Sequence, residues 1–215
     1  MTTHPLIPPD LSKITLAVLA GGAGTRMGMP KAHLRVEGRP ILAWLIDQFA
    51  WPGPTLLVTS PSTAQPPGSD AFHQQAVDPA DGIGPLQGVV TALTHSTTSL
   101  TAMVTVDMPH IDRTILLDLL GLMREDPSRI GIMSRRASDG PIEPFPAIFH
   151  RSAFPWIHER LAGGKRSVHG LCDHPSITAV LAPAHWTEQT WLNLNHPADF
   201  RAFSESRGMS IDSNP

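Results

Sequence analysis

Residues 14–31 read ITLAVLAGGAGTRMGMPK, which is the strongest fold signal in the chain. The first six residues, from Ile14 to Leu19, form a short, mostly apolar run that does not alternate, which is typical of a parallel strand covered on both faces. The run stops at Gly21, and residues 21–28 contain four glycines. A backbone without Cβ atoms can turn sharply and approach a ligand closely. This stretch therefore predicts a buried strand that leads into a ligand-binding loop.

The loop carries two fixed positive charges, Arg26 and Lys31. Successive backbone N–H groups in a glycine-rich turn can hold an anion, and Arg and Lys add bidentate and point-charge contacts to phosphate. Two better-known phosphate loops do not fit. A Walker A loop needs a glycine directly before its Lys, and a dinucleotide fingerprint needs a glycine where Met27 stands. The loop predicts a phosphate site of another kind, and an ordinary glycine-rich turn is the alternative.

The remaining chain alternates between strand and helix patterns. We expect strands over residues 55–59, 76–78, 103–107, 130–133, 146–149 and 177–181, and helices over 41–49, 85–93, 113–123, 152–161, 167–172 and from 197. This order predicts an α/β fold with a doubly wound, mostly parallel sheet of Rossmann-like type in three α/β/α layers. Ligands of such sheets bind at the carboxyl ends of the strands. We expect one domain over residues 14–207, a flexible leader over 1–13 and a flexible tail over 208–215.

Composition excludes several classes of function. The chain has 215 residues and a net charge of -3, which argues against a nucleic-acid groove. Its single cysteine, Cys172, cannot form an internal disulfide, which fits a reducing compartment. No apolar run reaches the roughly 20 residues that span a bilayer, and residues 1–10 lack the basic start of a signal peptide. We therefore expect a cytoplasmic protein with no nucleic-acid or membrane partner.

The loop over residues 19–31, Leu-Ala-Gly-Gly-x-Gly-Thr-Arg-Met-Gly-x-Pro-Lys, resembles the signature of nucleotidyltransferases that join a nucleotide to a phosphorylated partner. Sugar-nucleotide pyrophosphorylases share its first half but place many more residues between the Arg and the Lys. Arg26 and Lys31 are only five positions apart. This short form is similar to molybdenum cofactor guanylyltransferases and their close relatives.

Four later segments extend the resemblance in the right order. Asp78 with residues 84–88 resembles the family's Asp…Gly-Pro-Leu-x-Gly, and residues 104–109 resemble its strand ending in Cys-Asp-x-Pro. Residues 162–168 resemble its Gly-x-Arg-x-Val segment, and residues 193–200 resemble its Asn-x-Asn-x-Pro-x-Glu-hydrophobic ending. The resemblance therefore covers roughly residues 14–203.

The resemblance implies transfer of GMP from GTP to the phosphate of molybdenum-molybdopterin, with Mg²⁺ as cofactor and release of pyrophosphate. GTP and molybdopterin are the implied substrates, and molybdenum-insertion proteins or apo-molybdoenzymes are candidate protein partners. The implied catalytic residues are Arg26, Lys31 and Asp107, with Asp107 as the metal ligand. The implied nucleotide contacts are Leu19, Ala20, Gly21, Gly22, Gly24, Lys31, Thr59, Asp78, Gly84, Pro85, Leu86, Gly88 and Asp107. The implied contacts to the second substrate are Lys165, Arg166, Asn193 and Asn195.

Physical reasoning supports some of these roles and leaves others open. Asp107 ends an expected buried strand, where its carboxylate can hold Mg²⁺, although a turn or capping role is the alternative. Adjacent Lys165 and Arg166 also fit a solvated helix start, and the asparagines also fit a helix cap. The segment 143–146 either faces the second substrate or forms a turn.

Two departures from the family pattern concern the base. Relatives commonly carry Asn near Thr59, and Ala is more usual than Gln87. A cytidylyltransferase is therefore the first alternative function. A nucleotide-binding cofactor chaperone without turnover is the alternative from a different class.

Overall fold

The computed structural model describes residues 9–22, 24 and 26–207, and these form a seven-stranded sheet in the order β5-β4-β1-β6-β8-β7-β9. The strands are β1 (Ile14–Leu19), β4 (Thr55–Thr59), β5 (Gln74–Val77), β6 (Leu100–Thr105), β7 (Gly131–Arg135), β8 (Ile142–His150) and β9 (Ile177–Leu181). Strand β8 runs antiparallel to both of its neighbours, and every other pair in this sheet is parallel. The prediction of a mostly parallel sheet is confirmed.

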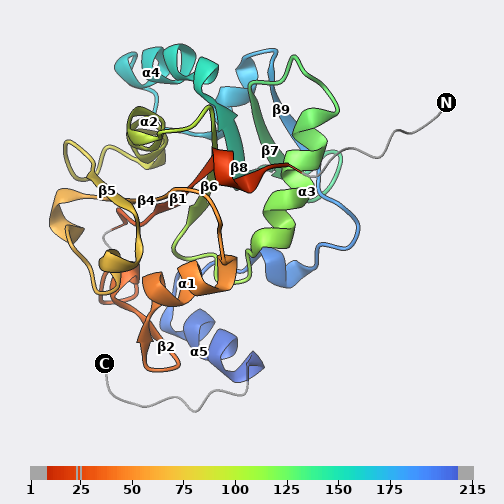
Figure 1. Cartoon of the computed structure of the whole chain (residues 1–215). Coiled ribbons are helices and arrows are strands. Elements are labelled where there is room, and N and C mark those ends of the chain that lie inside the picture. Colours follow the sequence, from red (N-terminus) through yellow and green to blue (C-terminus); the bar gives the residue numbers. More distant parts are fainter. Residues whose placement is uncertain (1–8, 23, 25, 208–215) are drawn as a thin grey trace.

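Helices cover both faces of this sheet (Figure 1). Helices α2 (Pro85–His95) and α4 (Phe154–Ala162) pack together on one face, while α1 (Ile41–Phe49) and α3 (Arg113–Arg124) lie on the other, with α5 (Pro197–Ser206) beyond α1. This gives the predicted three-layer α/β/α arrangement. Helix α3 begins after Asp112, whose carboxylate accepts a hydrogen bond from the backbone N–H of Ile115 at 3.0 Å, as a good N-cap does.

The central strands explain why their sequences do not alternate. All six residues of β1 are buried, and Leu16, Ala17 and Val18 are fully enclosed. Both faces of the strand carry helices, so its side chains enter apolar layers, and the one polar residue, Thr15, pairs its hydroxyl with that of Thr98 at 2.8 Å. The strand therefore holds the glycine-rich loop on a rigid base.

The structure corrects several details of the expected elements. A hairpin of β2 (Arg35–Val36) and β3 (Arg39–Pro40) is present that the sequence pattern does not predict, because strands of two residues show no periodicity. The helix expected over 167–172 is a 3-10 turn over His169–Asp173. Strand β6 ends at Thr105, so Asp107 lies two residues beyond the strand.

The expected leader and tail fall largely outside the described residues. Residues 1–8 and 208–215 are not described, and the last part of the expected leader, Leu11–Lys13, forms a 3-10 turn capped by Asp10. Across the described part of the chain, no helix has the length and apolar character that a membrane crossing needs.

Candidate active site

A cavity of about 390 Å³ lies where the parallel strands end. Leu19 closes β1, Thr105 closes β6, and Asp78 follows β5, so three strands deliver residues to the same edge of the sheet. This is the edge at which doubly wound sheets bind ligands. The cavity is lined by Leu19, Gly21, Gly22, Lys31, Val58, Ser60, Asp78, Ala80, Asp81, Gly82, Ile83, Gly84, Pro85, Gln87, Gly88, Thr105, Val106, Asp107 and Phe145.

One end of the cavity holds a three-residue polar cluster. Lys31 Nζ donates to Asp107 Oδ2 at 2.5 Å and to Asn195 Oδ1 at 2.7 Å. The side chains of Lys31 and Asp107 are 16% and 17% exposed, so their ion pair is partly shielded from water. Asn195 reaches the site because the backbone N–H of Leu194 donates to the carbonyl of Asp107 at 2.8 Å. Three segments far apart in sequence thus meet at one point.

The donor set at this end fits a divalent cation. The oxygens of Asp107 and Asn195 both lie within 2.7 Å of the same positively charged nitrogen, so they converge on a place where positive charge is stabilised. Carboxylate and amide oxygens are ligands that Mg²⁺ accepts. Among the described residues no group of three or more His, Cys, Asp or Glu side chains gathers. A Mg²⁺ ion here would therefore need further oxygens from water or a ligand, as it usually does.

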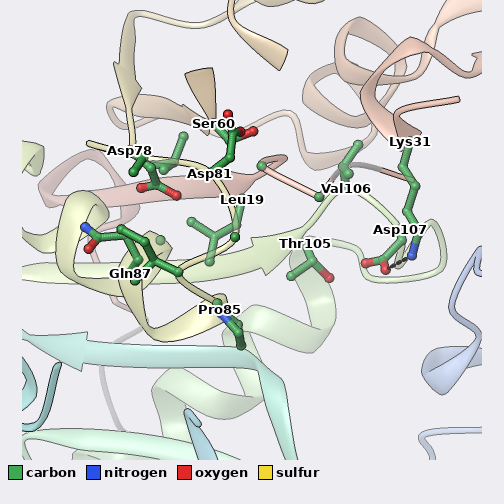
Figure 2. A pocket seen from close by; sticks show the side chains of 18 of the residues that line it. Leu19, Lys31, Ser60, Asp78, Asp81, Pro85, Gln87, Thr105, Val106 and Asp107 are labelled. Carbon is green, nitrogen blue, oxygen red and sulfur yellow. Dashed lines mark hydrogen bonds and ion pairs between the residues drawn. The ribbon is translucent and has the colours of Figure 1, made fainter. Parts of the chain in front are cut away.

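The opposite end of the cavity is rich in hydrogen-bond acceptors (Figure 2). Asp78, Asp81, Ser60 and Gln87 face this end, well separated from Lys31 and Asp107. Burial raises the pKa of the Asp78 carboxyl, although a hydrogen bond from Thr91 opposes that change. Asp81 accepts hydrogen bonds from the hydroxyl and the backbone N–H of Ser62, and these bonds lower the pKa of its carboxyl. Two carboxylates would repel a phosphate here and would accept from N–H donors instead.

Position 24 of the glycine-rich loop accepts only glycine. Its φ is +61°, and a Cβ atom there would overlap the carbonyl oxygen of Met29. Gly21 and Gly22 line the cavity, while Ala23 and Thr25 lie outside the described residues. The glycines therefore serve the shape of the loop as well as access to its backbone.

The structure brings many of the predicted nucleotide contacts to one cavity. Those that line it are Leu19, Gly21, Gly22, Lys31, Asp78, Gly84, Pro85, Gly88 and Asp107. Those that do not are Ala20, Gly24, Thr59 and Leu86, and Arg26, predicted as a catalytic residue, does not line it either. Thr59 is 3% exposed and its neighbours Val58 and Ser60 line the cavity in its place, because adjacent strand residues face opposite sides. Arg26 is exposed on the loop.

The residues expected to contact the second substrate lie at different places. Asn195 joins Lys31, whereas the amide of Asn193 donates to the carbonyl of Trp191 at 2.9 Å. Arg166 lies beside the start of α2, where its carbonyl accepts from the N–H of Leu86 at 3.3 Å, and Lys165 is exposed.

The segment 143–146 is part of strand β8 rather than a turn. Phe145 lines the cavity, while Glu143 pairs with Arg136 at 2.6 Å. One residue of this segment therefore reaches the cavity.

Several lining residues are absent from the predicted contacts, namely Ser60, Asp81, Gln87 and Thr105, while Phe145 belongs to the segment 143–146, for which a substrate-facing role is one of two expectations. Ser60 and Thr105 stand at the carboxyl ends of β4 and β6, so the strand-end rule that selected Asp107 would also have selected them. Asp81 lies in the loop between β5 and α2, at the same edge. Gln87 lies within the 84–88 motif and bears on the choice of base, but the sequence does not mark it as a contact, because the phase of its helix relative to the cavity is a tertiary property.

Comparison with known proteins agrees with this geometry. Residues 16–177 match the family model described as a MobA-like NTP transferase domain. A Deinococcus radiodurans protein named a probable molybdenum cofactor guanylyltransferase is 31% identical over 194 residues, which cover 89% of this chain and 94% of the relative.

Two solved structures share the fold. Molybdopterin-guanine dinucleotide biosynthesis protein A from Archaeoglobus fulgidus has a TM-score of 0.73 at 20% identity, with 90% of this chain and 98% of that chain covered. A Mycobacterium tuberculosis H37Rv protein solved in complex with manganese has a TM-score of 0.63 at 18% identity, with 90% and 99% covered. Because the family match spans more than half of the sequence, the chain belongs to the MobA-like NTP transferase family of nucleotidyltransferases.

Proposed function

We propose that the protein transfers GMP from GTP to the phosphate of molybdenum-molybdopterin in the cytoplasm, with Mg²⁺ and with release of pyrophosphate. The observation that carries this proposal is the polarity of the cavity, which has acceptors at one end and a cation beside metal-type oxygens at the other. The Deinococcus radiodurans relative supports the same activity through its name.

The polarity suggests how a nucleotide lies in the cavity. A triphosphate is repelled by Asp78 and Asp81 and attracted to Lys31, so its phosphates belong at the end with Lys31 and the glycine-rich loop. The base then lies against the carboxylates. Guanine offers two adjacent donors, N1–H and the 2-amino group, whereas the pairing edge of cytosine offers one donor and two acceptors. Carboxylates favour the former, which supports GTP over CTP.

The chemistry needs positioning and charge neutralisation more than proton transfer. The acceptor phosphate attacks the α-phosphorus of GTP, a new P–O bond forms, the bond from the α-phosphorus to the bridging oxygen breaks, and pyrophosphate leaves. Because the nucleophile is already an anion, no strong general base is required. Lys31, with Arg26 as a further candidate, would offset charge that builds on the leaving pyrophosphate. Asp107 and Asn195 would hold Mg²⁺, which when bound neutralises charge on nucleotide oxygens.

The second substrate would approach from the side of β8 and the Asn195 segment. Phe145 lines the cavity there, and Arg166 stands beside the start of α2. We propose Arg166, Lys165 and Asn195 as contacts to the pterin phosphate. Asn193 belongs to the same proposal only if its amide leaves the carbonyl of Trp191. Molybdenum-insertion proteins or apo-molybdoenzymes are the candidate protein partners for delivery of the substrate or receipt of the product.

The direct test measures pyrophosphate release with each of the four nucleoside triphosphates in Mg²⁺, with and without molybdopterin. Release with GTP and the pterin alone supports the proposal. Release with CTP instead would assign a cytidylyltransferase, and GTP binding without release would assign a cofactor chaperone. Asp107→Ala should abolish release while the circular dichroism spectrum stays unchanged. Retained activity in that variant would place the metal elsewhere.

A further inference from the structure

A chain of hydrogen bonds runs from helix α2 to the acceptor-rich end of the cavity. Gln87 Nε2 donates to Thr91 Oγ1 at 3.1 Å, and Thr91 Oγ1 donates to Asp78 Oδ1 at 2.5 Å. We propose that Gln87 and Thr91 are positioning residues that fix the Asp78 carboxylate so that it selects a base with two adjacent N–H donors. This inference rests on the proposed function, because it concerns how the same cavity recognises guanine.

The two hydrogen bonds run from Gln87 to Thr91 and from Thr91 to Asp78. This direction is possible because the hydroxyl of Thr91 has one hydrogen to donate and two lone pairs that accept. A threonine in a helix commonly donates to the carbonyl four residues earlier. Thr94 on the same helix does this, with Oγ1 donating to Val90 O at 2.8 Å. Thr91 donates instead to a carboxylate, which is a stronger acceptor. The side-chain amide of Gln87 donates to Thr91 Oγ1, and this occupies a lone pair of that oxygen and disfavours other orientations of the hydroxyl.

These hydrogen bonds leave one carboxylate oxygen of Asp78 available to a ligand. Its Oδ1 is engaged by Thr91, so Oδ2 is the atom available to a ligand. Oδ2 faces the glycine-rich loop, because a Cβ built on Gly21 would lie 3.5 Å from it. Burial raises the pKa of Asp78, and the hydrogen bond from Thr91 opposes that rise. The donation from Thr91 therefore orients the carboxylate and also favours its charged, accepting form.

The burial of the two helix residues makes this orientation stable. Gln87 is 7% exposed and Thr91 is 5% exposed, so neither side chain can readily exchange its partner for water. A buried polar group that loses its partner carries a free-energy cost, which holds the chain of hydrogen bonds together. The acceptor end is thus pre-oriented before a nucleotide arrives, and less ordering is needed on binding.

The ligand group that tests this inference is the 2-amino group of guanine. Inosine triphosphate (ITP) lacks only that group, so the ratio of its Kd to the Kd of GTP measures how well the site reads it. A ribose hydroxyl is the other donor that could reach Asp78. The ratio of Kd values for 2′-deoxy-GTP and GTP measures that contact separately.

The experiment is calorimetric titration of the full chain with GTP, ITP, 2′-deoxy-GTP and CTP in Mg²⁺. In the unmodified protein we expect ITP to bind about tenfold more weakly than GTP, since a hydrogen bond to a charged acceptor is lost. Thr91→Val keeps the side-chain shape but removes the hydroxyl, and should bring the ITP to GTP ratio close to one. Gln87→Met should lower the ratio partly, because Thr91 can still reach Asp78.

Two matched variants make the test specific. Thr91→Ser keeps the hydroxyl and should restore the ratio, while Thr94→Val removes a hydroxyl of the same helix that bonds only to its own backbone and should leave the ratio unchanged. An unchanged ITP to GTP ratio in both Thr91→Val and Gln87→Met overturns the inference, as does an equal loss of affinity for all four nucleotides. A change confined to the 2′-deoxy-GTP ratio also overturns it. Failure of the unmodified protein to prefer GTP over CTP refutes the proposed function instead.

Discussion

Lys31 and Asp107 form an ion pair across 76 positions of sequence, with 2.5 Å between Nζ and Oδ2. The ammonium group therefore occupies the place beside the carboxylate that a metal ion would need. Under the proposed function, the ammonium group of Lys31 and Mg²⁺ would compete for this carboxylate.

Replacement of Lys31 by Met should remove this competition. Nucleotidyl transfer should fall by about 10²- to 10³-fold, the usual effect of losing one electrostatic contact to a developing charge. Binding of Mn²⁺ to the nucleotide-free protein should tighten, because the competing ammonium is gone. Electron paramagnetic resonance of free Mn²⁺ measures the second effect. Lys13→Met, at an 82% exposed side chain, is the control. Mn²⁺ affinity no higher in Lys31→Met than in Lys13→Met would refute the competition.

Two glycines of the loop offer a matched pair of substitutions. Gly24 and Gly28 both have positive φ, +61° and +77°, but a Cβ at Gly24 overlaps Met29 whereas a Cβ at Gly28 meets open space. Gly28→Ala should lower stability by about 1–2 kcal/mol through backbone strain alone. Gly24→Ala should cost more and weaken GTP binding, because the loop must move. Thermal unfolding and GTP titration of both variants test this. Equal GTP affinities in the two variants would show that the shape of the loop does not control binding.

The buried carboxyl of Asp78 gives a prediction about pH. Its pKa lies above the ordinary value of 3.8, so the folded protein binds more protons than the unfolded chain in the range just above that value. Stability contributed by this group is therefore lost as pH rises through the folded pKa. Asp78→Asn should be more stable than the unmodified protein at pH 7, and the difference should vanish below pH 3.8. Urea unfolding across this range measures it.

Asp126 is a control for that experiment, because its carboxyl pKa is shifted in the opposite direction. Hydrogen bonds from Ser128 lower its pKa, so its contribution to stability is present at neutral pH and lost in acid. Asp126→Asn should not be more stable than the unmodified protein at pH 7. If Asp78→Asn is likewise no more stable than the unmodified protein at pH 7, burial is not the main influence on the pKa of the Asp78 carboxyl.

Asp199 positions the segment that carries Asn195. Its Oδ2 accepts from the backbone N–H groups of Asn195 at 2.9 Å and of His196 at 2.7 Å, at the start of α5. Asp199→Ala should lower stability by about 1 kcal/mol, as loss of a capping interaction does. Turnover should fall by about tenfold to a hundredfold, since a displaced metal-type ligand is costly. Asp199→Asn retains an acceptor and should recover much of both, and full activity in Asp199→Ala would exclude a positioning role.

Much of the nucleotide half of the fold could be predicted because its signals are local. The mostly apolar run of β1 predicts a buried strand. The rule that ligands bind at the carboxyl ends of strands predicts that Asp107 lies at the cavity. The meeting of Lys31 with Asn195 spans 164 positions and depends on where α5 packs, which no local pattern contains. The exchange of Thr59 for its neighbours Val58 and Ser60 has a similar cause, because a shift of one residue reverses the face of a strand.

The reversed direction of β8 has a consequence for how such a protein can change. Because β8 runs against β6 and β7, the connection between β7 and β8 is a hairpin that projects from the same edge as the cavity. The four parallel strands β5, β4, β1 and β6 are consecutive in the sheet and carry the proposed nucleotide side, and the hairpin lies beyond β6. Residues 136–141 form this connection, and Arg136 ties it to the segment before α5 through Glu188 and Trp191. Because Phe145 of β8 lines the cavity and residues 136–141 do not, a change of length in this connection would reach the cavity only by shifting β8.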